Sequence, residues 1–140
     1  MRCRYCMPKE FFDSKHQYLP RNEILSYEEI NLIVYSLIPL GLQKIRLTGG
    51  EPLLRKDICE LISMLPKELD IAMTTNGLLL EKNALKLKKA GLNRVTVSLD
   101  AIDLETFQTM GDTKENPETV LRGIEAARLA GLDVKINTVI

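Results

Sequence analysis

The sequence predicts an α/β fold in which parallel strands alternate with helices. Three observations support this fold class. The predicted elements from residue 44 onward follow the order strand, helix, strand, helix, strand, helix, strand, which is typical of parallel strands joined by right-handed crossovers. Apolar side chains recur at every second position of the strands and at helical spacing between them. Nothing within the 140 residues marks a domain boundary, so we expect a single domain, residues 1–140.

The first half of the chain begins with a polar loop over residues 9–23. Ser26 has the pattern of a helix N-cap, and Glu29 completes a capping box three residues later. The apolar side chains that follow lie at helical spacing, and Pro39 and Gly41 end the helix. A strand at 44–48, a turn at 49–52 and a helix at 57–65 come next, with Leu54 expected on the apolar side of that helix.

The second half continues the alternation. A strand at 71–75 ends in the turn signal Asn76-Gly77. Pro117 is placed in the first turn of the last helix, where proline is tolerated. The remaining expected elements are helices at 82–90, 104–110 and 117–130 and strands at 94–99 and 134–140.

Composition narrows the function classes. Lysine and arginine together equal aspartate and glutamate, 19 each, which argues against binding to nucleic acid or a membrane surface through bulk charge. No apolar run is long enough to span a membrane, and we expect no membrane partner. The odd number of cysteines, three, does not suggest a secreted disulfide framework, so a cytoplasmic location is expected.

The predicted strands have one apolar face and one small, polar, partly cationic face. Because successive strand residues point to opposite faces, the polar positions of all four strands share a side. They are Lys44, Arg46 and Thr48; Ala72 and Thr74; Thr96, Ser98 and Asp100; Lys135 and Asn137. A solvent-facing sheet would explain one such strand, but four favour a polar cavity inside a barrel, where chemistry sits at the C-terminal strand ends.

Three cations fall on this polar face. Lys44, Arg46 and Lys135 would suit an anionic ligand such as a polyphosphate. Taken singly, each could equally be a surface charge, and it is their shared position in the strand alternation that favours the binding interpretation.

Two cysteines near the start of the chain, Cys3 and Cys6, lie three residues apart. Thiolates at this spacing suit an iron–sulfur cluster or another soft metal. The spacing alone is equally compatible with zinc, a redox pair or plain thiols. Cys59 lies in a predicted helix with no partner at ligand spacing, and we interpret it as a core or boundary residue.

Several motifs in order resemble the radical S-adenosylmethionine (SAM) enzymes and, within them, the family of GTP 3′,8-cyclases of molybdenum cofactor biosynthesis. The resemblance covers essentially the whole chain. The motifs are Cys3-Arg4-Tyr5-Cys6-Met7-Pro8, Leu19-Pro20-Arg21-Asn22-Glu23, the stretch 44–53 with Gly49-Gly50-Glu51-Pro52, Thr74-Thr75-Asn76-Gly77, and Val97-Ser98-Leu99-Asp100.

The resemblance implies a role for eight side chains or backbone positions. Cys3 and Cys6 match two of the three cysteines that ligate a [4Fe–4S] cluster. Three positions, Tyr5, Gly50 and Ser98, match residues that bind SAM. Three others, Arg46, Thr74 and Lys135, match positions that bind GTP, with Lys135 towards its phosphates.

The resemblance also implies an activity. A lyase of this family uses a reduced cluster to cleave SAM, removes a hydrogen from C3′ of GTP and joins C3′ to C8, giving 3′,8-cyclo-7,8-dihydro-GTP. The implied partners are GTP, an electron donor, the downstream cyclic pyranopterin monophosphate synthase and a second copy of the chain in a homodimer.

The match to the family is incomplete at both ends. The first strand and the first motif cysteine would precede Met1, and the rest of the barrel, with a second cluster, would follow Ile140. We therefore expect this polypeptide alone not to turn over GTP, and its open strand edges to pair with another chain. Two other interpretations remain: a radical SAM enzyme with a peptide or sugar substrate, and a non-catalytic zinc-binding or scaffold domain.

Overall fold

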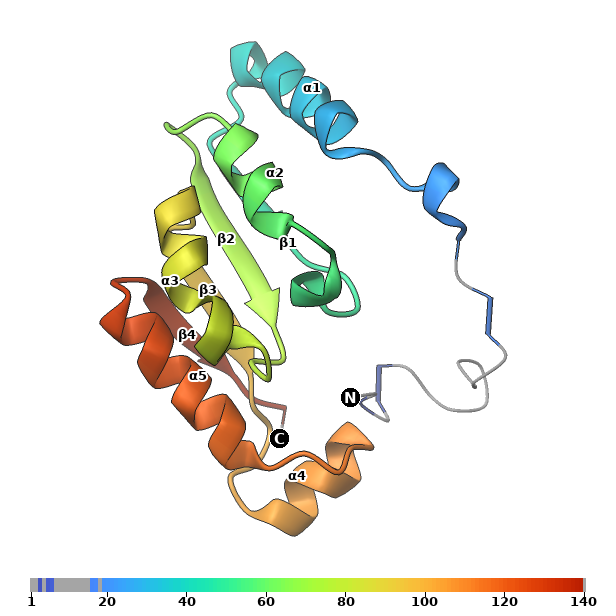
Figure 1. The fold of residues 1–140 in the computed structure, drawn as a ribbon, viewed down its shortest axis with the longest axis vertical. Helices are drawn as coiled ribbons and strands as arrows, with labels where there is room; N and C mark the ends of the chain where they lie inside the picture. Colours follow the sequence, from blue (N-terminus) through green and yellow to red (C-terminus); the bar gives the residue numbers. More distant parts are fainter. Residues whose placement is uncertain (1–2, 4, 7–15, 18, 140) are drawn as a thin grey trace.

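The structure, a computed structural model, describes residues 3, 5, 6, 16, 17 and 19–139. Its centre is a four-stranded sheet in which every pairing is parallel and the strands lie in chain order, β1-β2-β3-β4. The predicted parallel α/β arrangement is confirmed (Figure 1). The strands are β1 (Lys44–Leu47), β2 (Asp70–Thr75), β3 (Arg94–Ser98) and β4 (Asp133–Asn137).

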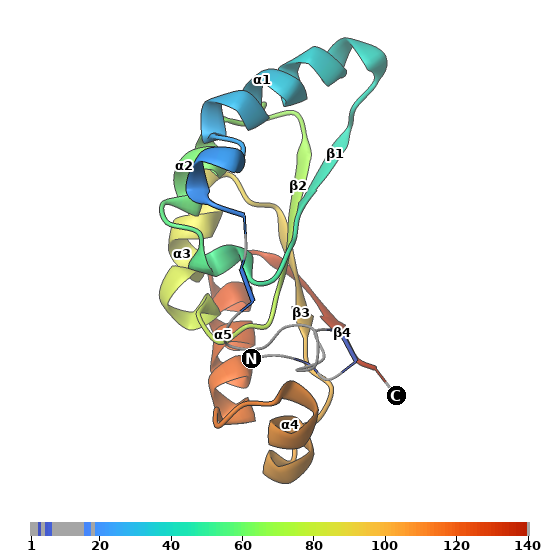
Figure 2. The same ribbon diagram turned by 90° about the vertical axis from the view of Figure 1, so that its right-hand side faces the viewer.

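All the α-helices except the first connect successive strands. Figure 2 shows α2, α3 and α5 along one face of the sheet, while the opposite face carries no helix among the described residues. The α-helices are α1 (Tyr27–Leu37), α2 (Ile58–Met64), α3 (Leu80–Ala90), α4 (Leu104–Gly111) and α5 (Pro117–Leu129). Three short 3-10 turns add η1 (Arg21–Glu23), η2 (Ile38–Leu40) and η3 (Pro52–Leu54).

The core lies between the sheet and this helical layer. Alternate residues of the two central strands point into it and are at most 2% exposed: Ile71, Met73, Val95 and Val97. Burying an apolar side chain of this size contributes roughly 1.5–3 kcal/mol. The apolar half of the predicted strand alternation therefore determines which face the helices cover.

Two glycines bring α5 close to the turn that follows β2. A Cβ on Gly123 would lie 2.7 Å from the carbonyl oxygen of Gly77. A Cβ on Gly77 would lie 2.8 Å from Val120 Cγ1, and this residue has a left-handed φ of 80°. Both positions require glycine, so the helix holds the C-terminal end of β2 firmly against the core.

Local signals in the sequence placed most ends of the helices and strands to within two residues. The predicted capping box is present: Glu29 N donates to Ser26 Oγ at 3.1 Å, and Ser26 N donates to a Glu29 carboxylate oxygen at 2.7 Å. Cys59 is partly buried and packs against the core, as expected for a boundary residue.

Two details differ from the sequence-based expectation. Leu54 is 75% exposed, because it belongs to η3 and the left-handed backbone at Asp57 redirects the chain before α2. The last strand ends at Asn137, although we expected it to reach residue 140. There Thr138 Oγ1 donates to the Leu99 carbonyl, and Val139 N donates to Asp100 Oδ1, replacing ladder hydrogen bonds. Ile140 lies outside the described residues.

Candidate functional site

A cavity of about 240 Å³ opens at the C-terminal ends of the strands. This is the edge where parallel α/β folds place their chemistry. Six of the eight predicted site residues line this one cavity, although they come from four separate parts of the chain. These residues are Cys3, Tyr5, Cys6, Gly50, Thr74 and Ser98.

The cysteine loop reaches the sheet through Asp100, the second residue after β3. The Tyr5 hydroxyl donates to Asp100 Oδ2 at 2.6 Å, and the other carboxylate oxygen accepts from Val139 N at 3.0 Å. Within the loop, Cys6 N donates to the Cys3 carbonyl at 2.9 Å. Asp100 therefore joins the cysteine loop to the ends of β3 and β4, a role the motif alone did not indicate.

Both ionisable groups that neighbour Asp100 in this loop have a raised pKa, which favours their neutral forms. Burial raises the pKa of the Cys3 thiol, and the Asp100 charge adds to this effect, while a hydrogen bond with Tyr5 opposes it. Burial and the hydrogen bond to Asp100 raise the pKa of the Tyr5 hydroxyl. A metal that binds at Cys3 must therefore displace a proton from the thiol.

Glu51 fixes the glycine turn against the end of β2. One carboxylate oxygen of Glu51 accepts from Thr75 Oγ1 at 2.8 Å, and the other accepts from Asn76 N at 2.7 Å. Beside this anchor, apart from the two chain neighbours of Gly50, no atom of the described residues lies within 4 Å of the point where a Gly50 Cβ would stand. The backbone at Gly50 is therefore open to close approach by a ligand in the cavity.

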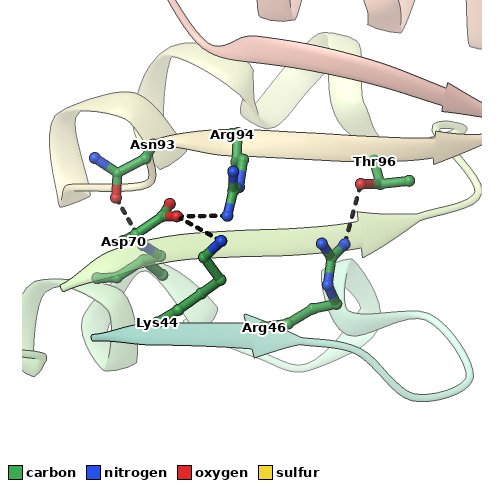
Figure 3. Close-up of polar contacts among 7 residues, drawn as sticks. Lys44, Arg46, Asp70, Asn93, Arg94 and Thr96 are labelled. Atoms are coloured by element: carbon green, nitrogen blue, oxygen red, sulfur yellow. Dashed lines mark hydrogen bonds and ion pairs between the residues drawn. The ribbon is translucent and has the colours of Figure 1, made fainter. Parts of the chain in front are cut away.

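The open face of the sheet carries a second cavity of about 270 Å³, towards the N-terminal ends of the strands. It contains the other two predicted substrate residues, Arg46 and Lys135, together with Lys44, Arg94, Thr96 and Asp133. Arg46 links the two cavities, because its Nη1 donates to Thr74 Oγ1 at 3.1 Å. The same nitrogen donates to Thr96 Oγ1 at 3.0 Å (Figure 3).

Lys44 differs from the other two predicted cations. Its Nζ lies 3.4 Å from Asp70 Oδ2, and Arg94 binds the same carboxylate oxygen (Figure 3). Within residues 19–139, neither Arg46 nor Lys135 has a carboxylate partner. The two cations that lie nearer the cysteine loop along the strands therefore keep their charge available for an anion.

The metal-binding potential of the cavity rests on its two thiols. Cys3 and Cys6 are both free of disulfides and both line the cavity. In the part of the chain that the structure describes, no group of three histidine, cysteine or acidic side chains could hold a metal ion. The donor set fits two sulfur ligands of an iron–sulfur cluster beside an open ligand space.

The chain belongs to the radical SAM superfamily, whose family model matches residues 1–140. It is 51% identical over 144 residues to a protein of Acidothermus cellulolyticus named GTP 3′,8-cyclase, covering all of this chain and 40% of that protein. It is 48% identical over 143 residues to the protein of the same name in Staphylococcus carnosus, covering 99% of this chain and 42% of that one. The chain thus spans about two fifths of these relatives.

Solved structures agree on the fold. The crystal structure of methylornithine synthase (PylB) matches with a TM-score of 0.72 at 20% identity, over 98% of this chain and 40% of that one. Streptococcus suis SuiB bound to precursor peptide SuiA matches with a TM-score of 0.76 at 19% identity, over 98% and 29%. These likenesses support the partial barrel that the strand pattern predicted. Among the described helices, none has the length and apolar character needed to cross a membrane.

Proposed function

We propose that residues 1–140 form part of the core domain of a GTP 3′,8-cyclase, a lyase that converts GTP to 3′,8-cyclo-7,8-dihydro-GTP in the first step of molybdenum cofactor biosynthesis. The observation that carries this proposal is the pairing of two cavities on one sheet. One holds the thiols, and the other holds Arg46 and Lys135, which have no carboxylate partner among the described residues. The Arg46–Thr74 hydrogen bond joins the two cavities. The names of the relatives agree with this pairing.

In this proposal the cavity at the strand ends is the cofactor site. Cys3 and Cys6 ligate irons of a [4Fe–4S] cluster, and Tyr5, Gly50 and Ser98 contact SAM. When bound, these cofactors supply the radical chemistry that the protein itself lacks. Supporting this, Asp100 holds the cysteine loop over the sheet and Glu51 holds the glycine turn, so the cavity walls are fixed by hydrogen bonds.

The open face is the substrate site. The guanidinium of Arg46 and the ammonium of Lys135 bind phosphate oxygens through charge-assisted hydrogen bonds. Thr74 lines the cofactor cavity and accepts from Arg46, so it lies at the boundary between the two sites. A nucleotide whose phosphates lie over β3 and β4 would present its sugar to the cofactor cavity.

The proposal extends to the partners of the reaction. It includes an electron donor for the cluster, a downstream cyclic pyranopterin monophosphate synthase that takes up the product, and a cytoplasmic location. It also includes a homodimer, in line with the sheet edges at β1 and β4, each of which pairs with one strand only in the described structure. Size-exclusion chromatography showing only monomer would contradict the dimer.

Phosphorus NMR of GTP titrated with the purified chain tests the substrate assignment. We expect the phosphate signals to broaden with the wild-type chain, and Lys135→Gln and Arg46→Gln to weaken binding by roughly tenfold each, since each removes a charged hydrogen bond. Lys89→Gln, an exposed lysine on α3, is the charge-matched control and should bind as wild type does. Unchanged phosphate signals with wild-type protein would contradict GTP binding by this chain.

A further inference from the structure

Thr96 lies at the centre of the three predicted substrate residues. The strand register pairs Thr96 with Thr74 on one side and with Lys135 on the other. Its Oγ1 accepts a hydrogen bond from the third residue, Arg46, at 3.0 Å (Figure 3). The strands bring all three side chains to one residue that no sequence motif singled out.

The Arg46 side chain is long and crosses a neighbouring strand, so a hydrogen bond to Thr96 in addition to the one to Thr74 helps to fix its position. Arg46 lies on β1, and neighbouring strands are about 4.7–4.9 Å apart, so its guanidinium extends across β2 to meet a side chain on β3. Arg46 is exposed and has no carboxylate partner among the described residues, and a long side chain in that state has many rotamers. The hydroxyls of Thr74 and Thr96 are the two groups that hold its Nη1.

The donor arrangement suits an oxyanion. A threonine hydroxyl has one hydrogen and two lone pairs, so Thr96 can accept from Arg46 and still donate. In the described structure its hydroxyl hydrogen has no protein acceptor, and the same holds for Thr74. The other guanidinium nitrogens of Arg46 and the Lys135 ammonium also keep hydrogens available. Arg46, Thr74, Thr96 and Lys135 can therefore all donate to one ligand. The carboxylate of Asp70 is occupied by Lys44 and Arg94, while the carboxylate of Asp133 lines the same cavity two residues before Lys135.

We propose that Thr96 is a positioning residue for polyphosphate binding, which holds the Arg46 guanidinium between β2 and β3 so that it and Lys135 bind the same phosphate chain. This inference rests on the proposed GTP site. Thr96 acts through Arg46, and its effect on affinity should vanish when Arg46 is removed.

The experiment is a double-mutant cycle measured by phosphorus NMR titration, with GTP and with inorganic triphosphate. Thr96→Val keeps the branched shape that suits a strand but removes the acceptor. We expect it to weaken both ligands roughly tenfold, the value of one hydrogen bond to a charged group. Thr96→Ser keeps the hydroxyl and should restore affinity to within about twofold. Thr119→Val on α5, on the helical side of the sheet, is the matched control and should have no effect.

The outcomes separate this inference from the substrate proposal. In an Arg46→Gln background, Thr96→Val should lower affinity by less than about twofold, because the two residues act as one unit. A full tenfold loss in that background, or wild-type affinity in Thr96→Val, would overturn the positioning role while leaving GTP as the substrate. Failure of the wild-type chain to bind either ligand would instead overturn the proposed substrate site. Thermal unfolding of each variant should match wild type, which excludes loss of folding as the cause.

Discussion

The two faces of the same sheet differ in almost every physical property. On the face that the helices cover, Met73 and Val97 are inaccessible to solvent. One residue away along each strand, Thr74 and Ser98 face the open side and line the candidate cofactor cavity. Because strand side chains alternate between faces, one residue packs in the core while the next along the strand lines a cavity. Stability should depend on one face and ligand chemistry on the other.

The largest expected effect on stability lies in the covered face. Leu87 on α3 is fully buried in the core, so Leu87→Ala should lower the free energy of unfolding by about 2–5 kcal/mol through lost burial and the cavity left behind. Leu85 on the same helix is 58% exposed, and Leu85→Ala should change this free energy by less than about 0.5 kcal/mol. Urea denaturation measures the free energy of unfolding of both variants. Equal losses in the two would contradict the expected difference between the buried and the exposed leucine.

A second effect on stability is expected from adding a methyl group at Gly123, where α5 packs closely against the turn after β2. Gly123→Ala places a methyl group 2.7 Å from the Gly77 carbonyl oxygen and 3.1 Å from Leu80 Cβ. Overpacking of this kind costs about 1–3 kcal/mol. The better helix propensity of alanine offsets at most about 1 kcal/mol. The thermal unfolding midpoint should therefore fall, and a rise would show that α5 can move away from the turn.

Much of this contrast could be predicted from the sequence because it depends on local rules. Alternation within each strand assigned residues to faces, and the capping box at Ser26 and Glu29 placed the start of α1. The common face of Arg46, Thr74 and Lys135 followed from the same alternation once the strands were taken as parallel. These inferences need only the order of residues and the geometry of one element.

The contacts between elements could not be predicted in the same way. Lys44 was expected to suit an anionic ligand together with Arg46 and Lys135, but the strand register sets it opposite Asp70, with which it forms an ion pair. Register depends on how two strands align. Glu51 and Asp100 anchor their loops by contacts to residues 24 to 95 positions away in the chain. Such roles appear only after the chain has folded, although both residues stand directly beside the motifs.

The ion pairs on the open face should contribute little to stability. Asp70→Asn removes the carboxylate that Lys44 and Arg94 share. The side chains of the three residues are 33–58% exposed. We expect a loss of about 0.2–1 kcal/mol. At 1 M salt the loss should shrink further, because the Debye length is then about 3 Å. Asp133→Asn is the control on the same face, since Asp133 has no ion pair among the described residues. A loss of several kcal/mol in the free energy of unfolding would contradict this expectation and show that the ion pairs stabilise the fold as strongly as core residues do.

The smallest effect on stability is expected where the chemistry is concentrated. Cys6 is exposed, so Cys6→Ser should change the free energy of unfolding by less than about 0.5 kcal/mol. The same change removes one of two thiolates from the candidate cofactor cavity, so iron and sulfide retained after anaerobic reconstitution should fall to background. Cys59→Ser tests specificity, because Cys59 packs against the core from α2 and its loss should leave the iron content unchanged. Equal iron in all three proteins would show that the thiols of the cavity bind no cluster.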